Sequence, residues 1–89
     1  MDKFIEVYEF YVDYSLWETE PKEIELKEIA LISFFKIADI YMHEYKNGWA
    51  ILIGLDNARE FCYSICNSKE NAYKVLNELK DKLNGRENG

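Results

Sequence analysis

The side chains of this chain that could do chemistry are one histidine, two cysteines and many carboxylates. His43 is the only histidine, the residue type whose unperturbed pKa lies nearest neutral pH. A zinc site would need three or four His or Cys ligands. Cys62 and Cys66 are four positions apart on an expected strand, and a rise of about 3.3 Å per residue would separate them by about 13 Å. We therefore expect no metal site and no cofactor.

Cysteine catalysis requires a base at hydrogen-bonding distance and an activated thiolate. Only His43 could be that base, and no local motif places it beside a cysteine. The cysteine spacing also differs from that of a redox pair. The seventeen acidic residues lack the apolar neighbours that would raise a carboxyl pKa. We expect a protein that is not an enzyme, with two free buried thiols, and an enzyme or ligand-binding domain centred on His43 is the least favoured alternative.

The elements that position these side chains are clearest from residue 40 to residue 85. Asn47 and Gly48 tolerate the positive φ values of a two-residue hairpin turn, which predicts Lys46 opposite Trp49. This pairing sets Ile40 and Met42 on one face of the sheet together with Ile51, Ile53 and Leu55. The other face then carries Tyr41, His43, Tyr45, Ala50 and Leu52.

Residues 49–55 are apolar at almost every position, which predicts a central strand covered on both faces. After a turn at residues 56–58, residues 59–66 form the next expected strand. A slip of one residue would exchange its two faces. We prefer the register that places Phe61, Tyr63 and Ile65 beside Ile51 and Ile53.

The last element is an amphipathic helix. Ser68 is its expected N-cap, and Gly85 is placed to close it. Its apolar stripe is spaced by three and four residues, as in a helix packed on a sheet, and consists of Ala72, Val75, Leu76, Leu79 and Leu83. Residues 86–89 are expected to be a disordered tail.

Before residue 40 the pattern is less regular. Residues 4–14 are rich in aromatic and β-branched residues and predict a strand. Residues 15–28 contain the only proline and read as an acidic, solvated connector, although Ile24 and Leu26 alternate with charges. Residues 29–35 favour a strand over a buried helical turn. The expected fold is a single α+β domain over residues 1–85, an antiparallel sheet of four or five strands with the C-terminal helix packed on one face.

One helix covers one face of a sheet, so something else must cover the other. The candidates are the segments 4–14 or 29–35 of the chain itself, a second copy, or a different protein. Exposed aromatic residues rimmed by charge are typical of interfaces. The side chains that we predict to bind a partner are the aromatic group Tyr41, His43, Tyr45, Trp49 and Tyr63 and the connector carboxylates Glu18, Glu20, Glu23, Glu25 and Glu28.

Charge and hydropathy restrict the function further. A net charge of −6 disfavours direct binding to DNA or RNA, whereas carboxylates arrayed like phosphates could occupy a basic groove of another protein. The longest apolar stretch, residues 29–40, is interrupted by polar residues and is too short to span a membrane. The first residues lack the pattern of a secretory signal, so we expect a cytoplasmic protein.

From residue 29 onward, the hairpin at Asn47 and Gly48, the turn at Asp56 and Asn57 and the Ser68-capped helix resemble the short meander-plus-helix proteins of phages and mobile elements. Some of those, including some anti-CRISPR proteins, are small acidic inhibitors that bind a nucleic-acid-handling host enzyme. The resemblance implies a protein-binding inhibitor. It lies in the order of elements, so it assigns no residue a role. The alternative function is a homo-oligomeric, for example homodimeric, structural or accessory protein.

Overall fold

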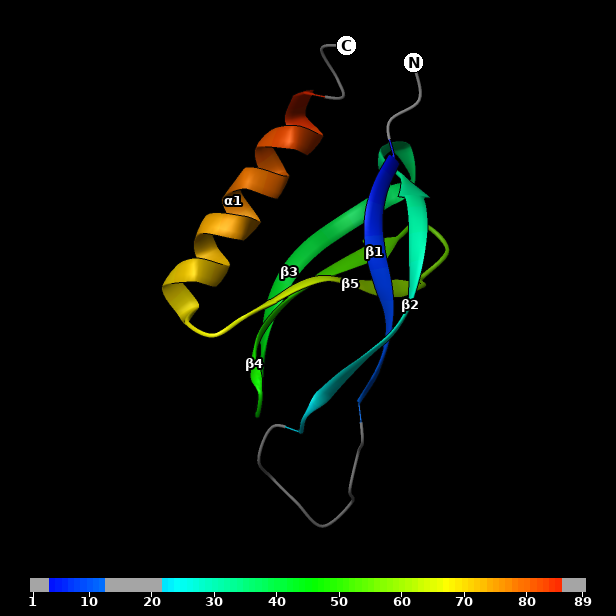
Figure 1. The fold of residues 1–89 in the computed structure, drawn as a ribbon. Helices are drawn as coiled ribbons and strands as arrows, with labels where there is room; N and C mark the ends of the chain where they lie inside the picture. Colours follow the sequence, from blue (N-terminus) through cyan, green and yellow to red (C-terminus); the bar gives the residue numbers. More distant parts are fainter. Residues whose placement is uncertain (1–3, 13–21, 86–89) are drawn as a thin grey trace.

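Five strands and one long helix follow one another along the chain in the computed structural model, which describes residues 4–12 and 22–85 (Figure 1). The elements are β1 (Phe4–Val12), β2 (Ile24–Ser33), a short 3₁₀ helix η1 (Phe34–Lys36), β3 (Ile37–Tyr45), β4 (Gly48–Leu55), β5 (Glu60–Cys66) and α1 (Lys69–Gly85). The strands form one antiparallel sheet in the order β2-β1-β5-β4-β3, and α1 packs on it. The predicted α+β architecture is confirmed.

The hairpin of β3 and β4 is confirmed, but its register differs from the prediction. Tyr45 lies opposite Gly48, so the two turn residues are Lys46 and Asn47. The predicted pairing of Lys46 with Trp49 was wrong. Trp49 pairs with Glu44 and not with Lys46, so the observed register differs from the predicted one by two residues. Strand side chains alternate between the two faces with a period of two. Both faces of the hairpin therefore carry the residues that the sequence predicted.

Strand β5 follows the preferred register only in its first half. Phe61 lies opposite Ile53, but Ser64 lies opposite Ile51. The extra residue is Tyr63, which makes a β-bulge, and a bulge changes which face the following residues occupy. Phe61 and Tyr63 pack with the cluster under the helix as predicted. The placement of Ile65 with them was wrong, because it packs on the opposite face.

The N-terminal part of the sheet is a hairpin of β1 and β2. The strand predicted from residue 4 is confirmed as far as Val12, and residues 13–21 lie outside the described residues. Residues 24–28 were predicted as a connector, which was wrong, because β2 begins at Ile24. In the described sheet β2 is an edge strand, and edge strands tolerate charged side chains. Strand β2 then ends at Ser33, and residues 34 and 35 belong to η1.

The hydrophobic core under α1 joins every element of the fold. It consists of Ile5, Val7, Ile32, Phe34, Ile37, Ile51, Ile53, Phe61, Ala72, Leu76 and Leu79. The predicted N-cap is confirmed, since the Ser68 Oγ accepts a hydrogen bond from the Asn71 N–H at 3.2 Å. Strand β4 is buried on both faces, as predicted, with Ala50, Ile51 and Ile53 completely buried.

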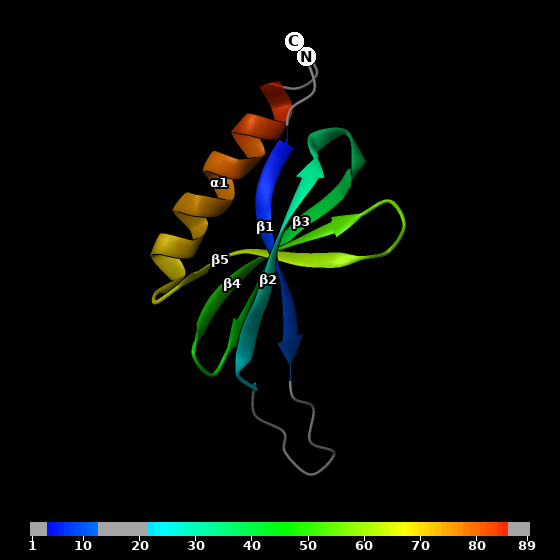
Figure 2. The same ribbon diagram turned by 45° about the vertical axis from the view of Figure 1, so that its right-hand side comes forward.

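The chain itself covers part of the second face of the sheet. Figure 2 shows that the sheet is strongly twisted and that the far end of the β1–β2 hairpin reaches the β3–β4 turn. Val12 and Ile24 from that end pack with Leu52 and Cys62 in a second cluster, which also contains Tyr45 and Ala50. Of the two chain segments considered, the N-terminal strand therefore covers this part of the face, and Ile24 contributes to it.

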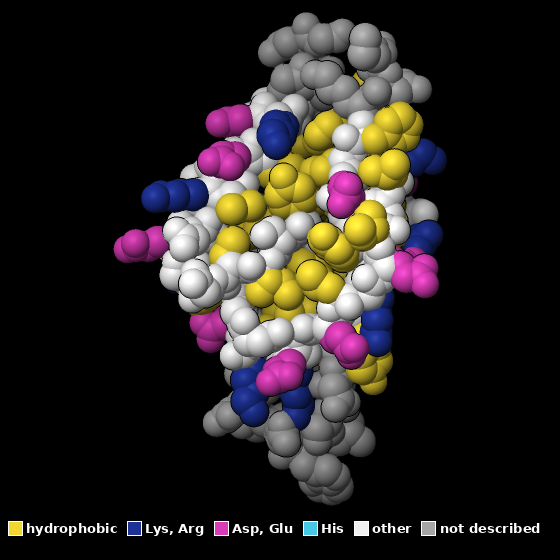
Figure 3. Space-filling view, viewed as in Figure 1, with side chains coloured by type: hydrophobic (Ala, Val, Ile, Leu, Met, Phe, Trp, Pro, Cys, Tyr) yellow, Lys and Arg dark blue, Asp and Glu magenta, His cyan; other side chains and the backbone are white. Residues whose placement is uncertain are grey.

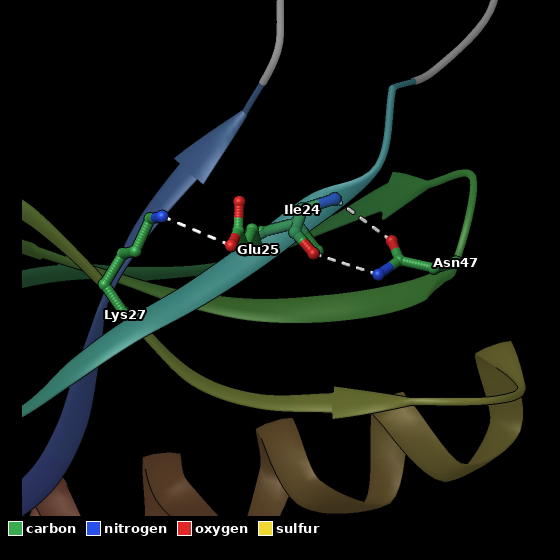
Figure 4. A network of polar contacts seen from close by, with 4 residues as sticks. All are labelled: Ile24, Glu25, Lys27 and Asn47. Atoms are coloured by element: carbon green, nitrogen blue, oxygen red, sulfur yellow. Dashed lines mark hydrogen bonds and ion pairs between the residues drawn. The ribbon is translucent and has the colours of Figure 1, made fainter.

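A short set of hydrogen bonds, which we call the Asn47 clamp, holds this arrangement (Figure 4). The Ile24 N–H donates to Asn47 Oδ1 at 3.1 Å, and Asn47 Nδ2 donates to the Ile24 carbonyl oxygen at 2.9 Å. The Lys46 N–H also donates to the Lys22 carbonyl oxygen at 2.9 Å. The side chain of Asn47 therefore acts like a neighbouring strand for the first residue of β2.

Candidate functional site

His43 lies on β3 with its side chain exposed. Its ring contacts the ring of Tyr45 edge to face, with 4.6 Å between the centroids. Within residues 4–12 and 22–85, no group of three or more His, Cys, Asp and Glu side chains is arranged to hold a metal ion. The contact that the structure shows for the His43 ring is the one with the buried ring of Tyr45.

The two cysteines are free and lie on opposite faces of the sheet. Cys62 is buried, as predicted, and its S–H donates to the Ser64 carbonyl oxygen at 3.5 Å. Burial raises its pKa to about 11. Cys66 is only partly buried, which corrects the prediction of two buried thiols. Because nucleophilic cysteines are exposed and have a lowered pKa, Cys62 is suited to packing and not to catalysis.

The raised pKa of Cys62 predicts a pH-dependent stability. The thiol of the unfolded chain, with an ordinary pKa of 9.0, ionises before that of the folded protein, with a pKa of about 11. The stabilisation is therefore complete below pH 9 and is lost as the pH rises through 11. We expect Cys62→Ala to reduce the loss of unfolding free energy between about pH 8 and about pH 11 by about 2 to 3 kcal/mol. Urea unfolding at both pH values measures this, and an equal loss in both proteins would contradict it.

Tyr41 has a structural role on the second face. Burial raises the pKa of its hydroxyl, and a hydrogen bond to the Glu60 carboxylate raises it further. The hydroxyl therefore remains protonated and donates to Glu60. Since it packs beside the second cluster, Tyr41 helps to hold β3 and β5 in place.

The aromatic residues predicted to bind a partner do not form one patch. Tyr45 is buried in the second cluster, and Tyr41 packs beside it. Trp49 and Tyr63 pack against the cluster under the helix, on the other face. The Lys69 ammonium lies 5.5 Å from the centroid of the Trp49 ring, which is within the range of a cation–π contact. A partner on one face could therefore contact only part of the predicted group.

The predicted carboxylates divide in a similar way. Glu18 and Glu20 lie outside the described residues. Glu23, just before β2, and Glu25 and Glu28, in the first half of β2, are exposed. Of these, Glu25 forms an ion pair with Lys27 at 3.2 Å, which Figure 4 shows. Their role in binding stays a prediction.

The sequence analysis missed a group of large apolar side chains that are exposed on β1 and β2. Leu31 is 68% exposed, Ile29 59%, Phe4 58% and Leu26 36%. The ladder places all four on the same face of the hairpin, opposite to Ile5 and Val7. We call these four residues the β1–β2 strip. The sequence of β1 did indicate such a surface, because its apolar residues occur at both odd-numbered and even-numbered positions and not only at the positions whose side chains are buried.

A groove lies beside the strip, between α1 and β1. The two strands at its base, β1 and β5, pair only at Tyr8 and Cys62. The groove has a volume of about 680 Å³, and the described residues that line it include the apolar Ile5, Phe34, Tyr63 and Val75, the charged Glu6, Glu78 and Lys82, and Phe4 from the strip. Figure 3 shows hydrophobic side chains across this side of the molecule, with charged side chains mostly at their borders.

Comparison of the chain with protein-family models, with curated proteins and with solved structures finds no significant match. No helix among the described residues is both long enough and apolar enough to cross a membrane. The β1–β2 strip and the adjoining groove are the surface of the described molecule best suited to contact another molecule.

Proposed function

We propose that this chain is a small, acidic, non-enzymatic protein-binding module that contacts its partner through the β1–β2 strip and the adjoining groove. One observation carries the proposal. Three large apolar side chains of the strip, those of Phe4, Ile29 and Leu31, are each more than half exposed, although the core is complete without them. Exposed apolar groups that lie together mark interaction sites.

The groove offers a place for an apolar anchor of the partner. Its lining includes the side chains of Ile5, Phe34 and Val75, and Phe4 lies at its edge. Anchors that fill such pockets supply most of the binding energy in protein interfaces. The charged groups of the lining are two carboxylates and one ammonium. This balance favours an apolar segment that carries lysine or arginine.

Carboxylates around the strip supply the attraction at long range. Residues 4–12 and 22–33 contain five glutamates and two lysines, and the whole chain carries a net charge of −6. Such a field increases the rate of association with a basic surface. The most concrete form of the proposal is an inhibitor of a bacterial nucleic-acid-binding enzyme, of the phage or anti-CRISPR type, whose basic groove this surface would occupy.

The experiment uses the intact chain and two matched variants. Wild-type protein, Phe4→Ser and Tyr73→Ser are immobilised and exposed to nuclease-treated bacterial lysate. Tyr73 is 47% exposed on α1 and lies outside the strip and the groove lining, so its variant is the control. Captured proteins are identified by mass spectrometry, and the affinity of each purified candidate is then measured.

For the true partner, we expect Phe4→Ser to weaken binding about tenfold or more and Tyr73→Ser to leave it within about twofold. We also expect binding to weaken between about 0.05 M and about 0.5 M salt, because salt screens the attraction between charges. A partner that binds all three proteins equally would contradict the proposed surface. An affinity independent of salt would contradict the role of the carboxylates.

A further inference from the structure

Among residues 4–12 and 22–85, β1 is the only strand that lies beside β2, so β2 is an edge of the described sheet. Ile24 directs its N–H and its carbonyl away from β1 and towards Asn47. In an antiparallel ladder this direction alternates from one residue to the next. Following the ladder through the bulge between Leu26 and Ile29 shows that Ile29 and Leu31 also direct their backbone groups away from β1.

No described residue bonds to these outward groups of Ile29 and Leu31. Soluble proteins usually protect such an edge with proline, several charges or a covering element. In β2 the charges are confined to residues 25, 27 and 28, and residues 29–33 have none. This half of the edge therefore presents both unpaired backbone groups and apolar side chains.

The ends of the free edge determine how another strand could pair with it. The Asn47 clamp occupies the edge at Ile24. At the other end the strand stops at Ser33, where η1 begins. The segment clear of both obstacles is residues 27–33, and its midpoint is Ala30. A second copy related by a two-fold axis through Ala30 would therefore pair residues 27–33 with themselves in the antiparallel sense.

This register makes the edge complementary to itself. Ile29 lies opposite Leu31 of the second copy, and the same pair occurs again across the axis. Both residues point their backbone groups at the partner, so each pair can form two hydrogen bonds. Lys27 would face Ser33, and Glu28 would face Ile32, so no like charges are opposed. Apolar pairs of this kind stabilise neighbouring strands.

We propose that two copies of this chain form a dimer by pairing their β2 strands, which joins the two five-stranded sheets into one ten-stranded sheet. The dimer does not depend on the binding of another protein. Its response to salt is also opposite to that of the proposed partner complex. Each copy carries a charge of −6, and salt screens the repulsion between them, so the dimer strengthens as salt increases.

Sedimentation velocity of the intact chain tests the dimer, at protein concentrations from about 1 μM to about 1 mM and at low and high salt. The test variant is Leu31→Pro. Proline at this position removes an outward N–H and leaves the ladder with β1 intact. The control is Phe35→Ser, since Phe35 is 63% exposed but lies beyond the end of β2. Circular dichroism verifies that each variant is folded.

We expect the wild type and Phe35→Ser to dimerise with rising concentration, and Leu31→Pro to raise the dissociation constant about tenfold or more. We also expect Ala30→Cys, at the axis, to form an intermolecular disulfide, and Glu28→Cys to form none. This second experiment requires no proline. A wild-type protein that is monomeric throughout the range would overturn the proposal. A dimer that Leu31→Pro leaves unchanged, or one cross-linked by Glu28→Cys and not by Ala30→Cys, would overturn it as well.

Discussion

Replacing Ile53 with alanine is expected to lower the free energy of unfolding by about 3 to 4 kcal/mol, within the range of about 2 to 5 kcal/mol for large aliphatic residues in a core. Ile53 is completely buried in the cluster under α1. It lies opposite Ile40 on β3 and Phe61 on β5, so its side chain is enclosed by both neighbouring strands and the helix. The strands fix the cavity that alanine would leave, and the site cannot collapse to fill it.

A loss of this size is a large part of the 5 to 15 kcal/mol that roughly spans the stability of natural domains. Urea unfolding followed by circular dichroism measures it, at a concentration low enough to keep the protein monomeric. Phe35→Ala is the matched control. Its side chain is 63% exposed, and we expect a change within about 0.5 kcal/mol. Equal effects of the two substitutions would contradict the assignment of Ile53 to the core.

The second large effect is expected at Gly48, where Gly48→Ala should cost about 2 to 3 kcal/mol. Gly48 has a backbone φ of +146°, a value that residues with a side chain rarely adopt. A Cβ at this position would lie 2.7 Å from the carbonyl oxygen of Cys66 and 2.9 Å from Ile65 Cγ2. The first of these atoms belongs to the backbone of β5, so it cannot move away without disturbing the sheet.

Gly54→Ala is the matched control on the same strand. A Cβ at Gly54 would come no closer than 3.9 Å to Asp39 Cβ, an ordinary contact distance. We expect its effect to stay below about 1 kcal/mol. Thermal unfolding of the three proteins gives the comparison. If the two alanine variants unfolded at the same temperature, the close approach of Gly48 to β5 would be in doubt.

The two hairpin residues also show what the sequence could and could not predict. Asn47 and Gly48 predicted a turn correctly. In the observed register Asn47 is a turn residue and its side chain bonds to Ile24, and no local pattern reveals a contact between residues 23 positions apart. The faces were still predicted correctly, because the shift was even. At Ile65 the face was wrong, since the bulge at Tyr63 changes the alternation and leaves no mark in the composition of the strand.

The candidate site was harder to predict than the fold. The sequence identified aromatic residues as a binding patch, but the alternation of side chains along the strands places Tyr41 and Tyr45 on one face of the sheet and Trp49 and Tyr63 on the other. The β1–β2 strip was missed because apolar residues at both parities of a strand are usually read as burial on both sides. Only the strand order shows that Ile29 and Leu31 lie at the end of the sheet. Exposure depends on non-local pairing, which periodicity does not encode.

The single pairing between β1 and β5 has a consequence for the order in which the chain folds. The β1–β2 hairpin and the run from β3 to α1 are each built from neighbouring segments, and such local contacts form early. Tyr8 and Cys62 are 54 positions apart, so their pairing closes a long loop and comes late. We therefore expect Ile5 and Val7 to become fully buried only when β5 and α1 have joined the cluster under the helix. Burial of β1 thus depends on elements that follow it far along the sequence.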